Sequence, residues 1–340
     1  MMNRRSFLLA CGSAAVAAHA HAAASTRLRI GQIGTEHSHA AGKMAAVRSL
    51  PELWEVVGVA AKKKGYDGIP LLTEDQLLNT PDLKAVIVET AVEESCPSAL
   101  RCIQAGKHVH LDKPGALEHA DFKAMRLEAE KRGLTVQMGY MLRYNPAFEL
   151  LFQAVRDGWL GEITEIDAAM GKLADTGTRG AIGKLPGGGL FELGCHIIDA
   201  ALTILGEPQS VTGFSTPAGT DGVQDNQMAV LQYAKATATI RVNHADPFGG
   251  PRRRFSVTGT EGTFEIVPLE SGKVNLSLTK ARGGYKKGTQ SFQLEVPKGR
   301  YDGEFRDLAK VVGGEKKLAW DAAHDIAVHE TVLRASGVWK

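Results

Sequence analysis

Residues that could perform acid–base chemistry are concentrated in GGGLFELGCHIIDAALTILG, residues 187–206. Glu192, His196 and Asp199 follow one another at spacings of four and three, which places them near one face of a helix. An imidazole flanked by two carboxylates can be oriented and made more basic, as a general acid–base residue requires. The segment therefore predicts a catalytic histidine near a helix start, although a histidine satisfied by its neighbours would give the same pattern.

A lysine follows a predicted strand in HVHLDKPGALEHADF, residues 108–122. Pro114 favours an extended backbone at Lys113, at the carboxyl end of that strand. A lysine there can polarise a hydroxyl or carbonyl group, and partial burial would lower its pKa into a useful range. A solvated loop lysine remains the alternative.

A sharp turn at Gly34 interrupts RIGQIGTEHSHAAGKMAAV, residues 29–47, between a predicted strand and a predicted helix. A dinucleotide-binding chain carries G-x-G-x-x-G at such a turn. Here the first glycine is present, but Glu36 and His39 occupy the other two glycine positions.

Short apolar strands alternate with helices over residues 27–139, which predicts a doubly wound parallel sheet of the Rossmann type. Thr73 is a predicted N-cap, and helices are expected at 97–106, with Pro97 near the start, and at 195–205. β-rich runs separated by Gly, Pro and Asn dominate residues 208–295, and two helical segments close the chain. The second half is therefore predicted to be an α+β domain with a mostly antiparallel open sheet.

The expected divisions are a leader at 1–24, a nucleotide-binding domain at 26–145 and a substrate and oligomerisation domain at 146–340, whose last helices can pack back on the first domain.

The N-terminus resembles a twin-arginine export signal, with Arg4 and Arg5 ahead of a short apolar run and a cleavage motif ending at Ala22. Without these two arginines the chain has 38 basic and 38 acidic side chains, so no global charge favours nucleic acid. We expect a periplasmic or otherwise extracytoplasmic protein that meets the export machinery and has no stable membrane anchor. Three cysteines remain after the leader, too few for a disulfide framework.

Taken together, these motifs resemble the Gfo/Idh/MocA family of glucose–fructose oxidoreductase and inositol dehydrogenase, over nearly all of residues 27–340. Asp112-Lys113-Pro114 fits the family's Glu-Lys-Pro tripeptide, and residues 192–199 fit its Asp-x-Gly-x-His-x-x-Asp motif with Glu in the first position. The resemblance implies NAD(P) bound between two domains, a sugar or polyol substrate, and a homo-oligomer formed through the C-terminal sheet.

The resemblance also implies roles for individual residues. Lys113 and His196 would be the catalytic pair, and Asp199 and Glu192 would orient the histidine or contact substrate hydroxyls. The residues expected at the substrate are Arg143, Tyr144, Gly188 and His196. Those expected at the cofactor are Gly34, Thr35, Glu36, His37, Ala61, Lys62, Glu89, Thr90, Asp112 and Lys113.

The chain departs from the family pattern at the cofactor end. Glu36 adds bulk and negative charge where the pyrophosphate would bind, although as a first-turn helix residue it could swing outward. Lys62 begins a basic turn where an acidic residue usually meets the ribose, which favours NADP over NAD unless the turn is simply solvated.

Three interpretations therefore remain open: a degenerate loop that still binds NADP or NAD, a divalent-metal or cofactor-free sugar-processing enzyme of lyase or hydrolase type, and a non-catalytic carbohydrate-binding protein. The metal alternative would use Glu36, His37, His39 and His110, unless these histidines only cap and pack the first helix. We interpret the remaining histidines as structural or surface residues: His108, His119, His244, His324 and His329.

Overall fold

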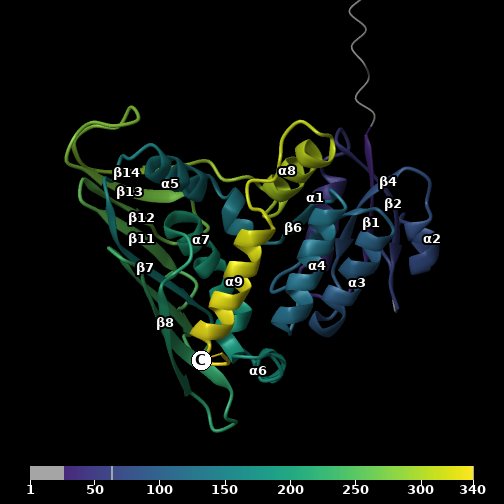
Figure 1. Cartoon of the computed structure of the whole chain (residues 1–340), viewed down its shortest axis with the longest axis horizontal. Helices are drawn as coiled ribbons and strands as arrows, with labels where there is room; N and C mark the ends of the chain where they lie inside the picture. The colour runs from purple at the N-terminus through teal and green to yellow at the C-terminus, as the bar shows by residue number, and fades with distance from the viewer. Residues whose placement is uncertain (1–26, 63, 340) are drawn as a thin grey trace, which may run out of the picture.

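The computed structural model describes residues 27–62 and 64–339, which form a parallel-sheet domain and an open-sheet domain with two C-terminal helices packed between and against them (Figure 1). The expected leader, with Arg4 and Arg5, lies outside the described residues.

The first domain is built on a six-stranded parallel sheet in the order β3-β2-β1-β4-β5-β6. Its strands are β1 Leu28–Ile33, β2 Trp54–Ala60, β3 Leu71–Leu72, β4 Leu83–Val88, β5 His108–Leu111 and β6 Val136–Met138. The order reverses direction at β1, so the carboxyl ends of β1 and β4 border the crevice in which such sheets bind ligands. The predicted Rossmann-like fold is confirmed.

Helices cover both faces of this sheet. They are α1 Ala40–Arg48, α2 Glu74–Leu78, α3 Val92–Gln104 and α4 His119–Lys131. Successive residues of a strand pack on opposite faces of the sheet. Ile30 and Ile87 pack with α1, whereas Val86 and Val88 belong to the core beneath α3 and α4. The predicted N-cap at Thr73 is confirmed, and with Gln76 it forms a complete capping box.

Two helix starts differ from the sequence prediction. The helix expected to begin at Pro97 begins at Val92, with Pro97 inside it and Glu93 and Glu94 in its first turn. These carboxylates favour the positive end of the helix dipole, so the helix extends past the proline. Glu36 is not in the first turn of α1, which begins only at Ala40.

The second domain is an eight-stranded sheet in the order β14-β13-β12-β11-β7-β10-β9-β8. Its strands are β7 Ile163–Gly171, β8 Ser210–Pro217, β9 Gln224–Gln232, β10 Thr237–Asn243, β11 Arg254–Gly259, β12 Gly262–Ile266, β13 Lys273–Leu278 and β14 Gly288–Gln293. The sheet is antiparallel, as predicted, except that β7 and β10 run parallel. Their carboxyl ends therefore meet at the same edge, next to the first domain.

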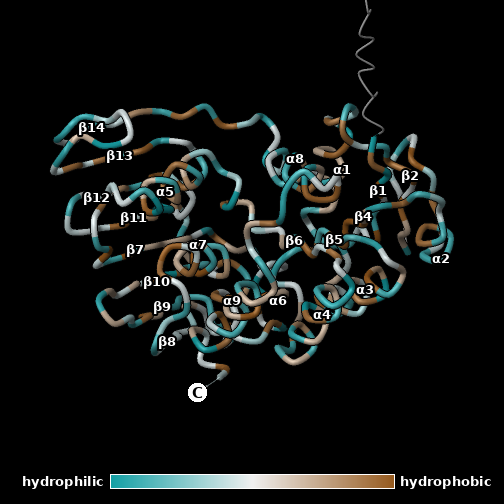
Figure 2. Tube along the Cα trace, turned by 45° about the horizontal axis from the view of Figure 1, so that its top comes forward, coloured by the Kyte–Doolittle hydropathy of each residue, from teal (hydrophilic) through white to brown (hydrophobic). Residues whose placement is uncertain are grey.

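The remaining helices fill one face of the open sheet and connect the domains. They are η1 Met141–Tyr144, α5 Pro146–Arg156, α6 Thr176–Ile182, the π-helical turn η2 Leu190–Gly194, α7 Cys195–Leu205, α8 Asp302–Val312 and α9 Ala322–Ala335. The trace of α7 is hydrophobic over much of its length, as expected for a helix buried against the sheet (Figure 2). Helix α8 packs on α1, and α9 contacts both α4 and α7, so the chain's end completes the first domain. Among the described residues, no helix is long and apolar enough to cross a membrane.

Candidate functional site

A cleft of about 400 Å³ opens at the carboxyl ends of the first strands. The sequence-predicted cofactor residues that line it are Gly34, Glu36, Ala61, Lys62 and Thr90. Residues of the second and third helices complete the wall, with Arg101 forming a bidentate ion pair with Glu74 (2.5 and 3.0 Å). The cleft lies where an open α/β sheet binds a nucleotide.

Gly34 makes the turn into this cleft possible. Its φ is +85°, a conformation that L side chains rarely adopt, and its backbone N–H donates to the carbonyl of Ala60 (2.8 Å). A Cβ on Gly34 would lie 2.7 Å from backbone atoms of Glu89 and Thr90. The first glycine of the dinucleotide pattern therefore retains its physical function of bringing the ends of β1 and β4 together.

Glu36 lies in the loop where the sequence resemblance places the pyrophosphate of a dinucleotide. Its exposed carboxylate Oε2 accepts a hydrogen bond from the backbone N–H of Thr35 (2.8 Å). Backbone N–H groups in this turn are the donors that a pyrophosphate would use. A dinucleotide that used the Thr35 donor would have to displace Glu36, which its solvent exposure permits.

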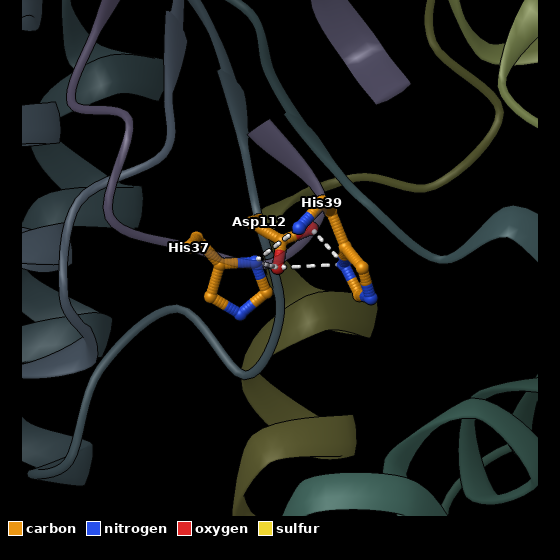
Figure 3. Close-up of side chains that lie close together, drawn as sticks. All are labelled: His37, His39 and Asp112. Carbon is orange, nitrogen blue, oxygen red and sulfur yellow. Dashed lines mark hydrogen bonds and ion pairs between the residues drawn. The ribbon is translucent and has the colours of Figure 1, made fainter. Parts of the chain in front are cut away.

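A buried network of charges lies beneath the loop. Lys43 of α1 is fully buried and forms ion pairs with Asp112 and with Glu89 (2.9 Å to Oε1). His37 Nδ1 lies 2.9 Å from Asp112 Oδ2 and 3.6 Å from Glu89 Oε2, and His39 Nδ1 lies 3.2 Å from the same Asp112 oxygen. Figure 3 shows the two imidazoles converging on the carboxylate. The structure thus places Glu89 and Asp112 under the loop rather than on the wall of the cleft.

These contacts set the charges of the network. Burial lowers the pKa of His37, but Asp112 and Glu89 outweigh it and raise the pKa to about 9. Burial instead dominates at His39, whose pKa is lowered. Burial also lowers the pKa of Lys43, but the surrounding carboxylates more than reverse this. Lys43 is therefore an ammonium that compensates part of the buried negative charge.

His110 does not join His37 and His39, so the metal alternative drawn from the sequence is wrong in part of its ligand set. His110 is fully buried, with Nδ1 2.8 Å from Gln137 Oε1 and Nε2 3.4 Å from Glu304 Oε2. Burial, with Lys43, lowers the His110 pKa to about 3, and burial raises the Glu304 pKa to about 8. A neutral Glu304 facing a neutral imidazole is a structural contact. Glu36 is not part of this group either: its carboxylate accepts from the Thr35 N–H, and the carboxylate that meets the two histidines is Asp112.

Lys113 and Glu192 meet across the two domains. Lys113 Nζ donates to the Glu192 carbonyl (2.7 Å) and lies 3.6 Å from its carboxylate Oε1. Burial lowers the pKa of Lys113, but Glu192 reverses this and the net shift is upward. The expectation of a lowered lysine pKa is therefore wrong, because the sequence did not show that a carboxylate would reach Lys113. Lys113 stays an ammonium, suited to stabilising negative charge.

Two further residues hold the Glu192 carboxylate. His244 Nε2 lies 2.9 Å from Glu192 Oε2, and Lys172 Nζ lies 3.3 Å from Oε1. Burial raises the pKa of Glu192, but Lys113, His244 and Lys172 together hold it well below its usual range. Sequence reasoning missed Lys172 and treated His244 as structural or surface. Both directly follow the parallel strands β7 and β10, so recognising that parallel pair would have identified them.

His196 is 4 % exposed at the start of α7, with the ring of Tyr140 edge-on at 5.9 Å. Its Nδ1 has no hydrogen-bond partner within the described chain. Burial, with Lys113 and His39, holds the His196 pKa well below its usual range. The predicted increase in basicity is not found, and His196 is a neutral imidazole able to accept a proton.

The structure does not bring Asp199 to His196. Arg143 holds the Asp199 carboxylate with two nitrogens (Nη2 at 2.6 Å), and His324 Nε2 lies 3.0 Å from it. Burial raises the Asp199 pKa, but Arg143 and His324 lower it to about 2. Arg143 also bonds Asp325 (2.6 Å) and is only 1 % exposed, so it anchors α7 and α9 together, and its expected substrate contact stays a prediction.

The other two expected substrate residues also make structural contacts. The Tyr144 hydroxyl bonds Gln137 (2.8 Å) and Asp307 (3.3 Å). Gly188 has a φ of +63°, and a Cβ there would lie 2.3 Å from the Gln224 carbonyl. The glycine run thus allows close packing against β9.

An α/β domain with a cleft at its strand ends, joined to an open-sheet domain that brings Glu192 to Lys113, defines the class of protein. Two domain models of one family match the chain. The oxidoreductase family's NAD-binding Rossmann fold matches residues 16–140, and the Gfo/Idh/MocA C-terminal domain matches residues 148–265. The chain belongs to the Gfo/Idh/MocA family, as the sequence motifs predicted.

Individual relatives share less than a third of their residues with this chain over the matched regions. The chain is 29 % identical over 209 residues to the uncharacterized oxidoreductase YhhX of Escherichia coli (59 % of this chain, 58 % of that protein). It is 25 % identical over 256 residues to the NADP(+)-dependent scyllo-inositol 2-dehydrogenase IolW of Bacillus subtilis (72 % of this chain, 65 % of that protein). The matches thus span roughly three fifths of these relatives' length.

Among solved structures, an oxidoreductase from Agrobacterium radiobacter in complex with NAD+, L-tartaric acid and magnesium has the same fold. Its TM-score is 0.76 at 15 % identity, over 92 % of this chain and 97 % of that chain.

Proposed function

We propose that this protein is an NAD(P)-dependent oxidoreductase that acts on a sugar, polyol or glycoside, with Lys113 and His196 as its catalytic pair. The observation that carries the proposal is the juxtaposition of two features. The cleft at the ends of β1, β2 and β4 is shaped by Gly34 as a dinucleotide site requires, and Lys113 follows the neighbouring strand β5. The family membership and the dehydrogenase relatives support the same activity.

The residues of the cleft fit a dinucleotide. Thr90 and Ala91 follow β4, and Ala61 and Lys62 follow β2, so a nucleotide bound there would lie across the strand ends. Lys62 is exposed on the rim, where an ammonium can meet a 2′-phosphate, which favours NADP. The bound nicotinamide would supply the hydride acceptor.

The chain's own residues would handle the proton and the developing charge. The neutral imidazole of His196 can take the proton of a substrate hydroxyl. The Lys113 ammonium can stabilise the alkoxide that forms. Glu192, fixed by His244 and Lys172, positions Lys113 through two contacts. Each group's charge state, as the structure sets it, matches its proposed task.

Nucleotide titration of the Glu36→Gly variant tests the proposal. Removing this carboxylate frees the Thr35 N–H and removes like charge near a phosphate, worth about 1 kcal/mol or a roughly fivefold tighter dissociation constant. Calorimetric titration with NAD+ and NADP+ measures the change. Glu94→Gln serves as the matched control, because Glu94 also lines the cleft but lies on α3. Absence of nucleotide binding in both the wild type and Glu36→Gly would reject the proposal.

We also propose that the protein is exported by the twin-arginine route and assembles as a homo-oligomer through its open sheet. The motif at Arg4 and Arg5 supports export. In the described part of the chain, α5, α7 and α9 pack on one face of the sheet, and alternate residues of β9 stay partly exposed on the other. Sedimentation velocity of the processed chain tests assembly, and a monomer at micromolar concentration would contradict it.

A further inference from the structure

Three potential metal ligands converge beside the proposed catalytic pair. The Nδ1 atoms of His37 and His39 and an oxygen of Asp112 all lie within 4.8 Å of one another. The two imidazoles approach the same oxygen, at 2.9 and 3.2 Å (Figure 3). Neighbouring ligands on an ion with bonds of about 2.1 Å are separated by roughly 3.0 to 3.4 Å. Little rearrangement would therefore place one cation between these atoms.

The buried negative charge around this cluster favours a bound cation. Asp112 and Glu89 are both buried carboxylates, and Lys43 supplies one ammonium between them. Neither Glu89 oxygen has a hydrogen-bond donor of good geometry in the described chain, and Oε2 lies 3.6 Å from His37 Nδ1. A buried carboxylate is costly unless positive charge lies beside it, so Asp112 and Glu89 favour a cation at this position.

The cluster is also accessible. The His37 and His39 side chains are 18 % and 24 % exposed, so an ion could enter from the loop and keep coordination positions open. Asp112 directly precedes Lys113 in the chain, so an ion bound to Asp112 would lie near the proposed catalytic lysine. A substrate oxygen could thus reach both the ion and the catalytic pair.

We propose that His37, His39 and Asp112 bind a first-row divalent transition-metal ion, with Glu89 as the nearby carboxylate that completes its charge balance. Two imidazoles and one carboxylate suit Zn²⁺, Mn²⁺ or Fe²⁺ rather than the oxygen-seeking Mg²⁺ or Ca²⁺. Open positions would be available to a hydroxyl or carbonyl oxygen of the substrate.

A second cluster in the chain gives a useful contrast. Asp199, His324 and Asp325 also lie within metal-binding distance of one another. Arginines already compensate both carboxylates, Arg143 on Asp199 and Arg126 on Asp325 (2.7 Å). We expect no metal there, because an ion would have to displace buried guanidinium groups.

Metal content and affinity test the proposal without relying on activity. The protein without its leader is stripped of metal with a chelator and loaded separately with Zn²⁺, Mn²⁺ and Fe²⁺. Plasma mass spectrometry then measures the number of ions bound per chain. Calorimetry then gives the affinity for Zn²⁺. We expect about one ion per chain, and His37→Gln and His39→Gln should each weaken binding at least about 100-fold.

His324→Gln is the matched control and should leave metal content unchanged. Glu36→Gln should also leave metal content unchanged, because the Glu36 carboxylate bonds the Thr35 N–H and is not one of the three clustered ligands. Circular dichroism checks that each variant is folded, and the spectrum of bound Co²⁺ reports imidazole coordination if one variant is too unstable for calorimetry. No ion bound by the wild type, or wild-type affinity for Zn²⁺ in both histidine variants, would overturn the proposal. Nucleotide titration is separate, so metal bound without nucleotide would refute only the oxidoreductase assignment.

Discussion

Replacing Lys43 with methionine should destabilise the first domain more than any surface change. The ammonium is fully buried and lies 2.9 Å from Glu89 Oε1, with Asp112 on its other side. One such contact corresponds to about 6 kcal/mol at an effective dielectric constant of about 20. Part of this is offset by desolvation, and breaking a buried pair by removing one partner costs about 3–5 kcal/mol in measured cases. We therefore expect the free energy of unfolding to fall by about 3–5 kcal/mol at neutral pH.

Urea denaturation followed by tryptophan fluorescence measures this loss, since Trp54 is buried in the core that α1 shares with α8. Lys84→Met is the control, because Lys84 is an exposed lysine on β4. Adding Glu89→Gln to Lys43→Met should restore part of the stability by removing one uncompensated charge. A Lys43→Met variant as stable as Lys84→Met would refute the interpretation of Lys43 as the compensating charge.

Three other predictions address catalysis, pH dependence and targeting. Lys113→Met and His196→Asn should each lower turnover at least about 100-fold while leaving the circular dichroism spectrum intact, and near-normal turnover in either would remove that residue from the catalytic pair. The pKa of Glu304 in the folded protein is about 8, above its ordinary value of 4.5. Between pH 4.5 and pH 8, the folded state therefore keeps a proton on Glu304 that the unfolded state has released. The free energy of unfolding should therefore fall as pH rises through this window, and Glu304→Gln should flatten the dependence measured by urea denaturation at several pH values. Changing Arg4 and Arg5 to lysine should stop export and processing, which immunoblots of cell fractions would detect; unchanged processing would contradict the twin-arginine route.

Local patterns in the sequence were sufficient to predict much of the fold. The helix expected at 195–205 is α7 as observed, and the capping signal at Thr73 marks the start of α2. The alternation of strands and helices in the first domain predicted the parallel sheet, because buried parallel strands need continuous apolar runs and crossover helices. Lys113 could be placed at a strand end for the same reason.

Contacts between distant segments were not predictable in this way. The parallel pairing of β7 with β10, which brings Lys172 and His244 to Glu192, depends on strand order in a sheet that local patterns describe only as β-rich. The π-helical turn at Leu190–Gly194 precedes α7, and Asp199 faces Arg143 on η1. Spacing along one helix could not show which partner each side chain would meet.

The metal alternative illustrates the same limit. The sequence identified His37 and His39, but it paired them with Glu36, their neighbour in the chain. The tertiary structure pairs them with Asp112, at the end of another strand. A ligand set assembled from several strand ends becomes visible only when the sheet order is known.

The central claim is that the protein works with a nicotinamide dinucleotide, and a mass spectrum of the molecules released from it would test that claim most directly. The protein should be purified from its own compartment without added nucleotide, denatured, and its supernatant analysed for small molecules and metals. We predict NADP(H) or NAD(H) at a substantial fraction of one molecule per chain, because the export that we propose would require a tightly held cofactor. Catalytically active protein that releases no nucleotide, and that is not stimulated by added NAD+ or NADP+, would contradict it.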